Sequence, residues 1–475
     1  MSLLLHSPEN LANVRVLLTP LEQAVRATFG YKWGKILVAY RLQLQILYLC
    51  TLLILQEFFR NFVPDSLKTV DAYAAIRIKD YRRFVFARFF LMLGTQMQAV
   101  IVGWQIYEIT HDALSLGMIG LAEAVPFFVI ALFAGHVADN VSRKKIIVSS
   151  NIVYFMCAFA LFAVSAMLHP LLQTFGALPI YAIIFITGLA RGFIFPAQNA
   201  FAAQLVPREL YGNAVTWNSI MWHIAAVVGP AIGGLTCGFY GISMAYSVVV
   251  VLSGLSIILF ALVKKRDLPA KIKEETIWES LTSGVRFVFG NQIILSAISL
   301  DMFAVFFGGA VSILPIFADQ VLHTGAKGLG FLRAAPAVGA IMMSVIQTHR
   351  PFFKKAGRSL ITCVFGFGIT IILFALSRNI YIAMAVLIIN GMFDNVSVVI
   401  RGTIMQLYTP DEMRGRVSAV NSIFIGSSNE LGSFESGVAA KLLGLIPSII
   451  FGGTMTLAIV ESIRRLAPNL KKLEL

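Results

Sequence analysis

The sequence predicts an all-α membrane protein in which twelve transmembrane helices form two parallel six-helix repeats behind an N-terminal extension. Three observations support this prediction: an apolar composition, twelve segments long enough to cross a bilayer, and a pattern that recurs in the second half of the chain. Of the 475 residues, 58% are hydrophobic and 13% are charged, and the mean hydropathy is +0.80. Because a soluble domain has about 25% charged residues, most of this chain is expected to lie in lipid.

Twelve apolar segments follow residue 84, each of roughly the 20 residues that a helix needs to cross a bilayer. We expect helices, because lipid offers no partner for an unpaired backbone group and the segments are too continuously apolar for barrel strands. Their expected limits are 84–109, 115–138, 146–167, 178–200, 214–236, 242–263, 291–318, 327–347, 359–377, 380–403, 417–439 and 442–462. The corresponding domains are an N-terminal extension at 1–80, a first bundle at 81–263, a cytoplasmic linker at 264–290, a second bundle at 291–463 and a cytoplasmic tail at 464–475.

The charges of the loops predict the orientation of these helices. One alternate set of loops is rich in basic residues, whereas the other set holds only Lys327, Arg378 and Lys441. Cytoplasmic loops carry the excess of Lys and Arg in membrane proteins. Both ends of the twelve-helix unit are therefore expected in the cytoplasm, in a multi-pass protein of the bacterial inner membrane.

The net charge of +14 has the same origin and does not indicate nucleic acid as a partner. The basic residues lie in short loops and form no continuous patch. The sequence contains no GxxxxGK[ST] phosphate-binding motif. Neither the four cysteines nor the seven histidines show the spacing of a metal site or a catalytic pair. We therefore expect no enzyme activity, no cofactor and no metal.

Residues 1–80 fit the pattern of spans less well. An apolar run at 46–55 is flanked by charged and amide side chains, and a span there would place Arg15, Arg26 and Lys32 outside. An interfacial helix or a poorly ordered extension is therefore favoured. A thirteenth span and a later start of translation remain the alternatives.

The chain contains an internal repeat. Residues 206–220 match residues 409–423 with a constant offset of 203, and a second alignment with an offset of 210 places Pro126 on Pro336. Matches in register at corresponding places predict two parallel halves of six helices each. This is the layout of carriers in which two bundles rock around a central site.

Two motifs stand at informative places in the first repeat. The loop after the second segment reads GHVADNVSRKK. It has a glycine, an aspartate four residues later and then a basic cluster: Gly135, Asp139, Arg143, Lys144 and Lys145. A glycine there lets helix ends approach closely, and the basic residues face lipid headgroups; a plain cytoplasmic turn is the alternative. The fifth segment contains GPAIGG, residues 229–234. Its glycines Gly229, Gly233 and Gly234 permit close helix packing, and a bend is expected at Pro230.

These motifs resemble the signature loop of the major facilitator superfamily and the glycine-proline motif of its antiporters, although Asn140 stands where a basic residue is common. Over about residues 70–440 the chain is similar to the efflux branch that includes the enterobactin exporter and macrolide efflux pumps. The stretches that carry this similarity are 87–110, 300–318, 331–340 and 427–437. The resemblance implies the major facilitator fold, a gating role for the first motif, and export rather than uptake.

Charged side chains within the spans are functional candidates, because placing them in lipid is costly. The candidates for proton coupling are Asp301, Asp394, Arg191, Glu430, Glu123 and Arg333. The resemblance implies that the first, fourth, seventh and tenth helices line a central cavity, which ranks Arg191, Asp301 and Asp394 first. Because a carboxylate in a partly dry cavity binds a proton more readily, Asp301 or Asp394 is predicted to carry the proton. Arg191 is predicted to pair with that carboxylate or with an anionic substrate.

A purely structural pairing of these charges is the alternative. Arg88, near the inner end of the first segment, either reaches the headgroups or has a function of its own. A promiscuous substrate pocket is expected to be mostly apolar with a few polar groups, for which the candidates are Gln96, Gln98, Gln105, Gln198, Asn199, Trp217 and Asn218.

The sequence therefore predicts a monomeric secondary carrier that works by alternating access and exports a small amphipathic organic compound, such as a drug or a siderophore-like molecule, against inward proton flow. Its expected partners are the substrate, protons and the bilayer. An uptake carrier of the same fold, and a membrane sensor or assembly partner that transports nothing, remain the alternatives.

Overall fold

The computed structural model describes residues 71, 73–265, 277–309, 311–349, 355–410, 413–471 and 473. For residues 131–140, 169, 195, 277–281, 348–349 and 419 it describes the backbone alone. Every regular element among these residues is a helix. Up to residue 70, the predicted extension lies outside the described residues.

The first bundle holds six long helices. In chain order its elements are α2 (Ala74–Arg77), α3 (Lys79–Thr110), α4 (Ala113–Asn140), α5 (Arg143–Ala166), α6 (His169–Phe175), α7 (Leu178–Leu205), η2 (Arg208–Leu210), α8 (Tyr211–Tyr240) and α9 (Ile242–Ala261). The long helices α3, α4, α5, α7, α8 and α9 correspond to the first six predicted segments. Short helices α2, α6 and η2 lie in the connections.

The second bundle also consists of long helices joined by short helical connections. Its elements are α10 (Ile277–Gly290), α11 (Gln292–Gly308), α12 (Leu314–Ile316), η3 (Phe317–Val321), α13 (Gly325–His349), α14 (Ala356–Leu376), α15 (Ile380–Tyr408), α16 (Arg414–Leu443), α17 (Leu445–Leu466) and α18 (Pro468–Lys471). Ten helices of the described chain are long and apolar enough to cross a membrane, and an eleventh is added if the bent pair of α10 and α11 counts as one span. Helix α16 is more polar, but its 30 residues reach about 45 Å at 1.5 Å per residue. The all-α membrane fold is thus confirmed.

The seventh predicted segment, 291–318, departs from a single helix. Helix α11 ends at Gly308, and the chain becomes helical again only at Leu314. Two consecutive glycines favour a break because glycine loses most backbone entropy in a helix, and Pro315 suits the first turn of the next helix. At its other end, α11 begins after a bend of 99° from the preceding helix. There the side chain of Asn291 accepts hydrogen bonds from the backbone N–H groups of Ile293 and Ile294.

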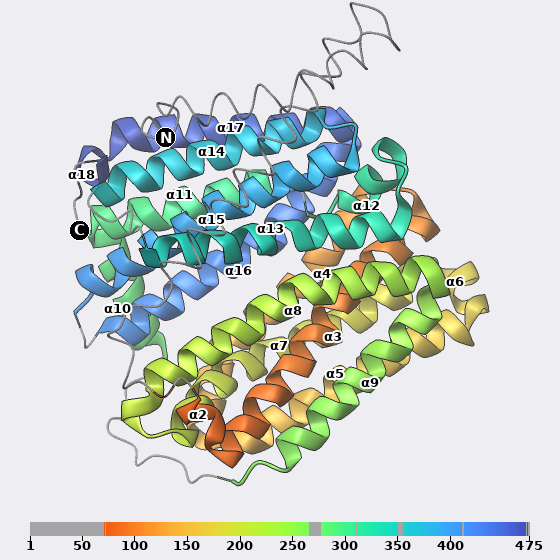
Figure 1. Cartoon of the computed structure of the whole chain (residues 1–475), viewed down its shortest axis with the longest axis horizontal. Coiled ribbons are helices and arrows are strands. Elements are labelled where there is room, and N and C mark those ends of the chain that lie inside the picture. The colour runs from red at the N-terminus through yellow and green to blue at the C-terminus, as the bar shows by residue number, and fades with distance from the viewer. Residues whose placement is uncertain are drawn as a thin grey trace, which may run out of the picture. The chain divides into compact units, whose positions relative to one another are not determined.

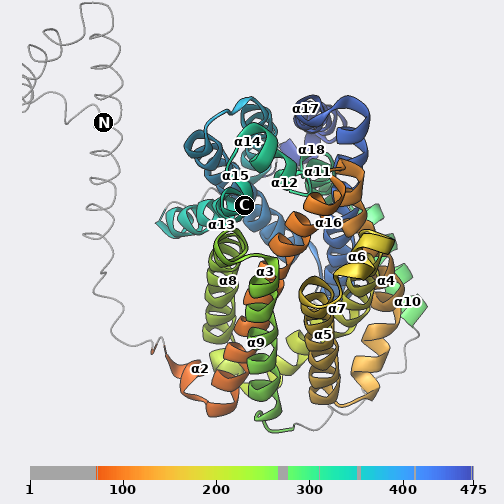
Figure 2. The same ribbon diagram turned by 90° about the vertical axis from the view of Figure 1, so that its right-hand side faces the viewer.

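The two bundles contact each other near one end of their helices and diverge toward the other (Figure 1). The contacts pair α4 with α16 and α8 with α13, and Figure 2 shows α8 beside α13 from a second direction. We call the contacting end the closed end; it holds the connections after α3, α8, η3 and α16. We call the opposite end, which carries Arg143, Lys144 and Lys145, the basic end.

The apolar core follows the same division. Its largest cluster lies toward the closed end and joins both bundles, for example through Tyr107 and Tyr246 of the first and Phe317 and Leu332 of the second. Toward the basic end the core splits into clusters within the first bundle and within the second. Among the described residues, the buried apolar cluster that joins the two bundles therefore lies toward the closed end.

Candidate functional site

A cavity of about 590 Å³ lies between the bundles. Five helices of the first bundle and four of the second line it. Its wall combines apolar and polar side chains, as in sites for small organic ligands that fix a polar group. Its polar and charged lining residues are Thr95, Gln96, Gln98, Glu123, Tyr154, Thr187, Arg191, Trp222, Ser312, Arg333, Asn429, Glu430 and Ser433.

Three charged side chains meet in this cavity, and we call Glu123, Arg191 and Glu430 the charge triad. The Arg191 guanidinium donates from Nη1 to Glu123 Oε1 at 2.6 Å and to Glu430 Oε1 at 2.8 Å. Its Cζ also lies 5.4 Å from the centroid of the Phe127 ring. Since Glu123 and Arg191 belong to the first bundle and Glu430 to the second, the triad is an ionic link between the bundles.

Arg333 supplies a second polar link across the cavity. Its Nη1 donates to the backbone carbonyl of Ala99 at 2.9 Å, so a cation of the second bundle is held by the first. Together with the triad, it makes two positive and two negative charges. Two of these contacts, Arg191 with Glu430 and Arg333 with the Ala99 carbonyl, therefore cross from one bundle to the other.

Close helix packing places the triad. A Cβ on Gly188 would lie 2.6 Å from the Glu123 carbonyl oxygen, and one on Gly120 would lie 2.5 Å from the Glu430 carbonyl oxygen. These glycines therefore let α7 and α16 approach α4 at the level of the charges, which shortens the reach from Arg191 to both carboxylates.

Asp301 and Arg401 form a separate ion pair inside the second bundle. Each is only 5% exposed, and neither lines the cavity. Asp394, on α15, is half-buried and makes no ion pair among the described residues. The tenth helix contributes no residue to the cavity wall as described, although the resemblance implied that it would.

Replacing Asp301 by Asn is expected to destabilise the fold by about 3–5 kcal/mol, because the buried Arg401 charge loses its partner. Replacing both residues by apolar ones, Asp301→Leu with Arg401→Met, should recover most of that loss. Thermal unfolding of the purified protein measures both effects. The control is Glu461→Gln, which breaks an exposed ion pair with Arg464 and Arg465 and should change the Tm little. An unchanged Tm in Asp301→Asn would contradict the assigned pairing.

The predicted amide and aromatic candidates fall into three groups. Gln96 and Gln98 line the central cavity. Gln105 does not, because it donates to Ser165 Oγ at 2.8 Å and accepts from Tyr246 at 2.8 Å, tying α3 to α5 and α9. The remaining candidates lie toward the basic end: Gln198 is buried with its Nε2 unbonded, Trp217 packs on the Tyr73 ring, and Asn199 and Asn218 line a second, smaller cavity.

The glycine-proline motif of α8 packs against both bundles. A Cβ on Gly229 would lie 2.7 Å from Gln96 Cβ, and one on Gly233 would lie 3.1 Å from Met97 Cα. A Cβ on Gly234 would lie 2.6 Å from Gly330 Cα of α13, and Pro230 stands inside the helix one turn earlier. The motif therefore brings α8 into backbone contact with α3 and, at the closed end, with α13.

Polar contacts that the sequence did not reveal also join the bundles at the closed end. The Tyr107 hydroxyl donates to Asp319 Oδ2 at 2.7 Å, and Lys441 Nζ lies 3.5 Å from Asp112 Oδ1. Partial burial raises the pKa of Asp112, but hydrogen bonds from Ser115 and the Lys441 charge outweigh it and hold this pKa below its usual value. In the sequence Lys441 is visible only as a loop charge, because its partner Asp112 lies in the other half of the chain.

The predicted gating residues lie at the basic end. Gly135 and Asp139 belong to the last turns of α4, where side chains are outside the description. Arg143 donates to the Ala200 carbonyl at 3.3 Å, and Lys144 donates to the Ala261 carbonyl at 2.7 Å. Cations stabilise helix C-terminal ends, so these two residues tie α5 to the ends of α7 and α9. Lys145 is exposed.

Comparison with known proteins identifies the family of this chain. Residues 70–474 match the model of a family described as transmembrane secretion effectors. The enterobactin exporter EntS of Shigella flexneri is 25% identical over 394 residues, which cover 80% of this chain and 92% of the exporter. EntS of Escherichia coli O1:K1 gives the same identity and coverage.

Solved transporters share the fold. A POT family transporter in complex with 5-aminolevulinic acid has a TM-score of 0.67 at 11% identity, covering 82% of this chain and 96% of that one. A bacterial homologue of the human lysosomal transporter Spinster, inward-facing and unoccupied, has a TM-score of 0.63 at 16% identity, with coverage of 83% and 98%. At these identities the likeness concerns the fold alone.

Proposed function

We propose that this chain exports a small amphipathic organic compound in exchange for protons. The chain belongs to the transmembrane secretion effector family of the major facilitator superfamily. It is therefore a multi-pass membrane transporter rather than an enzyme. The proposed location is the bacterial inner membrane, with the basic end in the cytoplasm. The similarity to an exporter supports the direction, and the basic loops support the orientation.

The observation that carries this proposal is the charge triad, in which a single guanidinium bridges two bundles across a cavity. In the described conformation the closed end is packed and the bundles diverge toward the basic end. A compound from the cytoplasm would thus reach the cavity while the outer side is shut. Alternating access then requires the triad and the closed-end contacts to separate.

Competition for Arg191 couples the two fluxes. A polar group of the compound displaces Glu430 from Arg191, which removes the ionic link and favours opening of the closed end. A proton from outside then neutralises Glu430, so the empty carrier returns without an unpaired carboxylate. At the basic end the proton leaves, and the link between Arg191 and Glu430 forms again.

The energy of this link is of the right order for a switch. Breaking a fully buried pair costs about 3–5 kcal/mol, and the Arg191 side chain is 41% exposed, so solvent screening reduces the figure. A coupling of about 1–3 kcal/mol remains sufficient to shift two conformations by 5–150-fold.

Two other acids have secondary roles in this proposal. Asp394 is a second candidate for the proton, since it has no ion-pair partner among the described residues. Asp301 is assigned to holding α11 against α15 through Arg401, so that the second bundle moves as one body.

Transport in proteoliposomes tests the proposal. An imposed pH gradient, acidic on the side of the closed end, should drive accumulation of amphipathic dyes or drugs on that side, and each transport event should move protons the other way. Accumulation that ignores the pH gradient would contradict proton coupling, whereas accumulation on the basic side would indicate an uptake carrier. A panel without any transported compound would favour a sensor or assembly role.

A further inference from the structure

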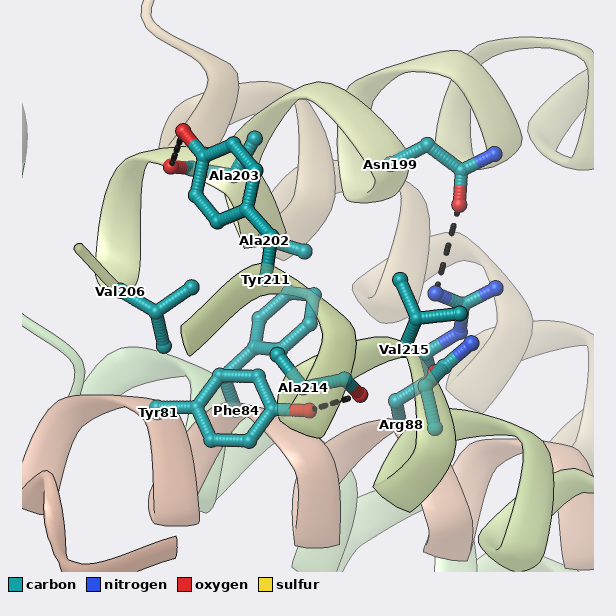
Figure 3. A pocket seen from close by; sticks show the side chains of 11 residues that line it. Tyr81, Phe84, Arg88, Asn199, Ala202, Ala203, Val206, Tyr211, Ala214 and Val215 are labelled. Atoms are coloured by element: carbon teal, nitrogen blue, oxygen red, sulfur yellow. Dashed lines mark hydrogen bonds between the residues drawn. The ribbon is translucent and has the colours of Figure 1, made fainter. Parts of the chain in front are cut away.

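A second cavity of about 280 Å³ lies within the first bundle, toward the basic end. Residues of α3, α7 and α8 and of the connection after α7 line it, and Figure 3 shows their side chains. Most of the wall is apolar and includes Phe84, Val206 and Val215. The polar side chains are those of Arg88, Asn199 and Asn218, together with two tyrosines.

Among the residues that the structure describes, Arg88 is a buried cation without an anionic partner. It is 8% exposed and forms no ion pair among the described residues. Its Nη1 donates to Asn199 Oδ1 at 3.3 Å, whereas its Nε is buried without any hydrogen-bond partner. A buried charge is costly unless it is paired, so this guanidinium is equipped to receive an anion.

The tyrosines do not supply free donors. The Tyr81 hydroxyl donates to the Ala214 carbonyl at 2.6 Å, and the Tyr211 hydroxyl donates to the Ala203 carbonyl at 2.9 Å (Figure 3). Both rings therefore present apolar faces to the cavity. The chemistry of the site is one cation, two amides and an apolar wall, which suits an organic anion with an apolar body.

The position of this cavity connects it to the central one. Arg88 lies one helical turn before Met92, and Asn218 lies one turn before Trp222. Met92 and Trp222 both line the central cavity. Residues one turn apart share a helix face, so the smaller cavity continues the central one along α3 and α8 toward the basic end.

We propose that the Arg88 cavity is an intake site that binds the acidic group of an amphipathic organic anion on its way to the central cavity. The inference rests on the proposed export function for its physiological meaning, but binding itself does not require transport. It assigns the substrate class as organic acids, with Arg88 as the anion-binding residue and the α3, α7 and α8 walls around the apolar body.

Photolabelling of the full-length protein in phosphatidylcholine nanodiscs tests the site directly. The probe is 4-azidobenzoate, and its uncharged match is 4-azidobenzyl alcohol. Mass spectrometry should place the carboxylate label on cavity residues such as Phe84 and Ala202. Because charge-assisted hydrogen bonds are the strong ones, labelling by the alcohol should be weaker by about tenfold or more.

Matched variants separate charge from folding. Arg88→Gln should reduce carboxylate labelling of the cavity by about tenfold or more, whereas Arg88→Lys, which keeps the charge, should retain most of it. Arg82→Gln is the control, since Arg82 is exposed on the same helix. Ala203→Phe keeps Arg88 but adds a bulky ring at a residue that lines the cavity, and should also abolish labelling.

Each remaining outcome contradicts the proposal. Equal labelling by the acid and the alcohol, or labelling that persists in both Arg88→Gln and Ala203→Phe, would overturn it. Anionic headgroups are the other source of such a charge. If phosphatidylglycerol in the nanodisc suppresses labelling, and if binding of phosphatidylglycerol to the protein depends on Arg88, the site binds a lipid rather than an organic acid. Because no gradient is applied, these results stand whether or not proton-driven export is found.

Discussion

Glu430→Gln is expected to abolish proton-driven accumulation while leaving exchange of the compound across the membrane. The amide cannot carry a proton, but it can still lie beside Arg191 and Ser433 in the cavity wall. A pH difference of one unit corresponds to 1.36 kcal/mol, so each exchanged proton supports about tenfold accumulation per unit. In the variant this ratio should fall to about 1 at any gradient.

The measurement is accumulation in proteoliposomes at several imposed pH differences, with radiolabelled exchange at equal pH as the second readout. Glu435→Gln is the matched control, because Glu435 is on the same helix but does not line the cavity. It should leave both readouts unchanged. Full gradient-driven accumulation in Glu430→Gln would show that the triad does not couple transport to protons. Asp394 would then be the remaining candidate for the proton carrier.

Gly234→Leu combined with Gly117→Leu is expected to open the closed end. A Cβ at these positions would lie 2.6 Å from Gly330 Cα and 3.1 Å from Gly437 Cα, both in the opposite bundle. Overpacking costs about 1–3 kcal/mol at each site, and the cost arises only where the bundles meet. For the two sites together, the shift toward the conformation open at this end should therefore be about 30-fold or more, with loss of net transport.

A cysteine at Ser312, which lines the cavity, reports this shift through its reaction with a membrane-impermeant thiol reagent added to the outer face. The reaction should be slow in the parent and fast in the glycine variant. Gly212→Leu serves as the control, because a Cβ there meets nothing within 4 Å. Equal reaction rates in all three proteins would show that these glycine contacts do not close the outer side.

The membrane fold was predictable because each span carries its own signal. Apolar length identifies a helix regardless of its neighbours, and the match of residues 206–220 with 409–423 identifies two halves without any structure. The break at Gly308 was less visible, since the flanking residues are as apolar as those of an unbroken span. Its signals were the glycine pair and Pro315 just beyond it.

The arrangement of the site was only partly predictable, because it depends on which way each helix turns. Asp301 and Glu430 are both single acids in apolar runs, yet Asp301 pairs with Arg401 inside one bundle and Glu430 faces the cavity. The hydrogen bond from Arg191 to Glu430 joins residues 239 positions apart. No local pattern reports such a pairing, and for the same reason the sequence could not decide whether Arg88 reaches headgroups or a cavity.

Two spin-label distances test the central claim that the closed end and the basic end open in alternation. One pair of labels at Met244 and Tyr381 spans the bundles at the closed end, and another at Leu262 and Leu466 spans them at the basic end; all four side chains are exposed. A transported compound should lengthen the first distance and shorten the second in the same population of molecules. If both distances stay fixed, or change in the same direction, the bundles do not alternate around the charge triad.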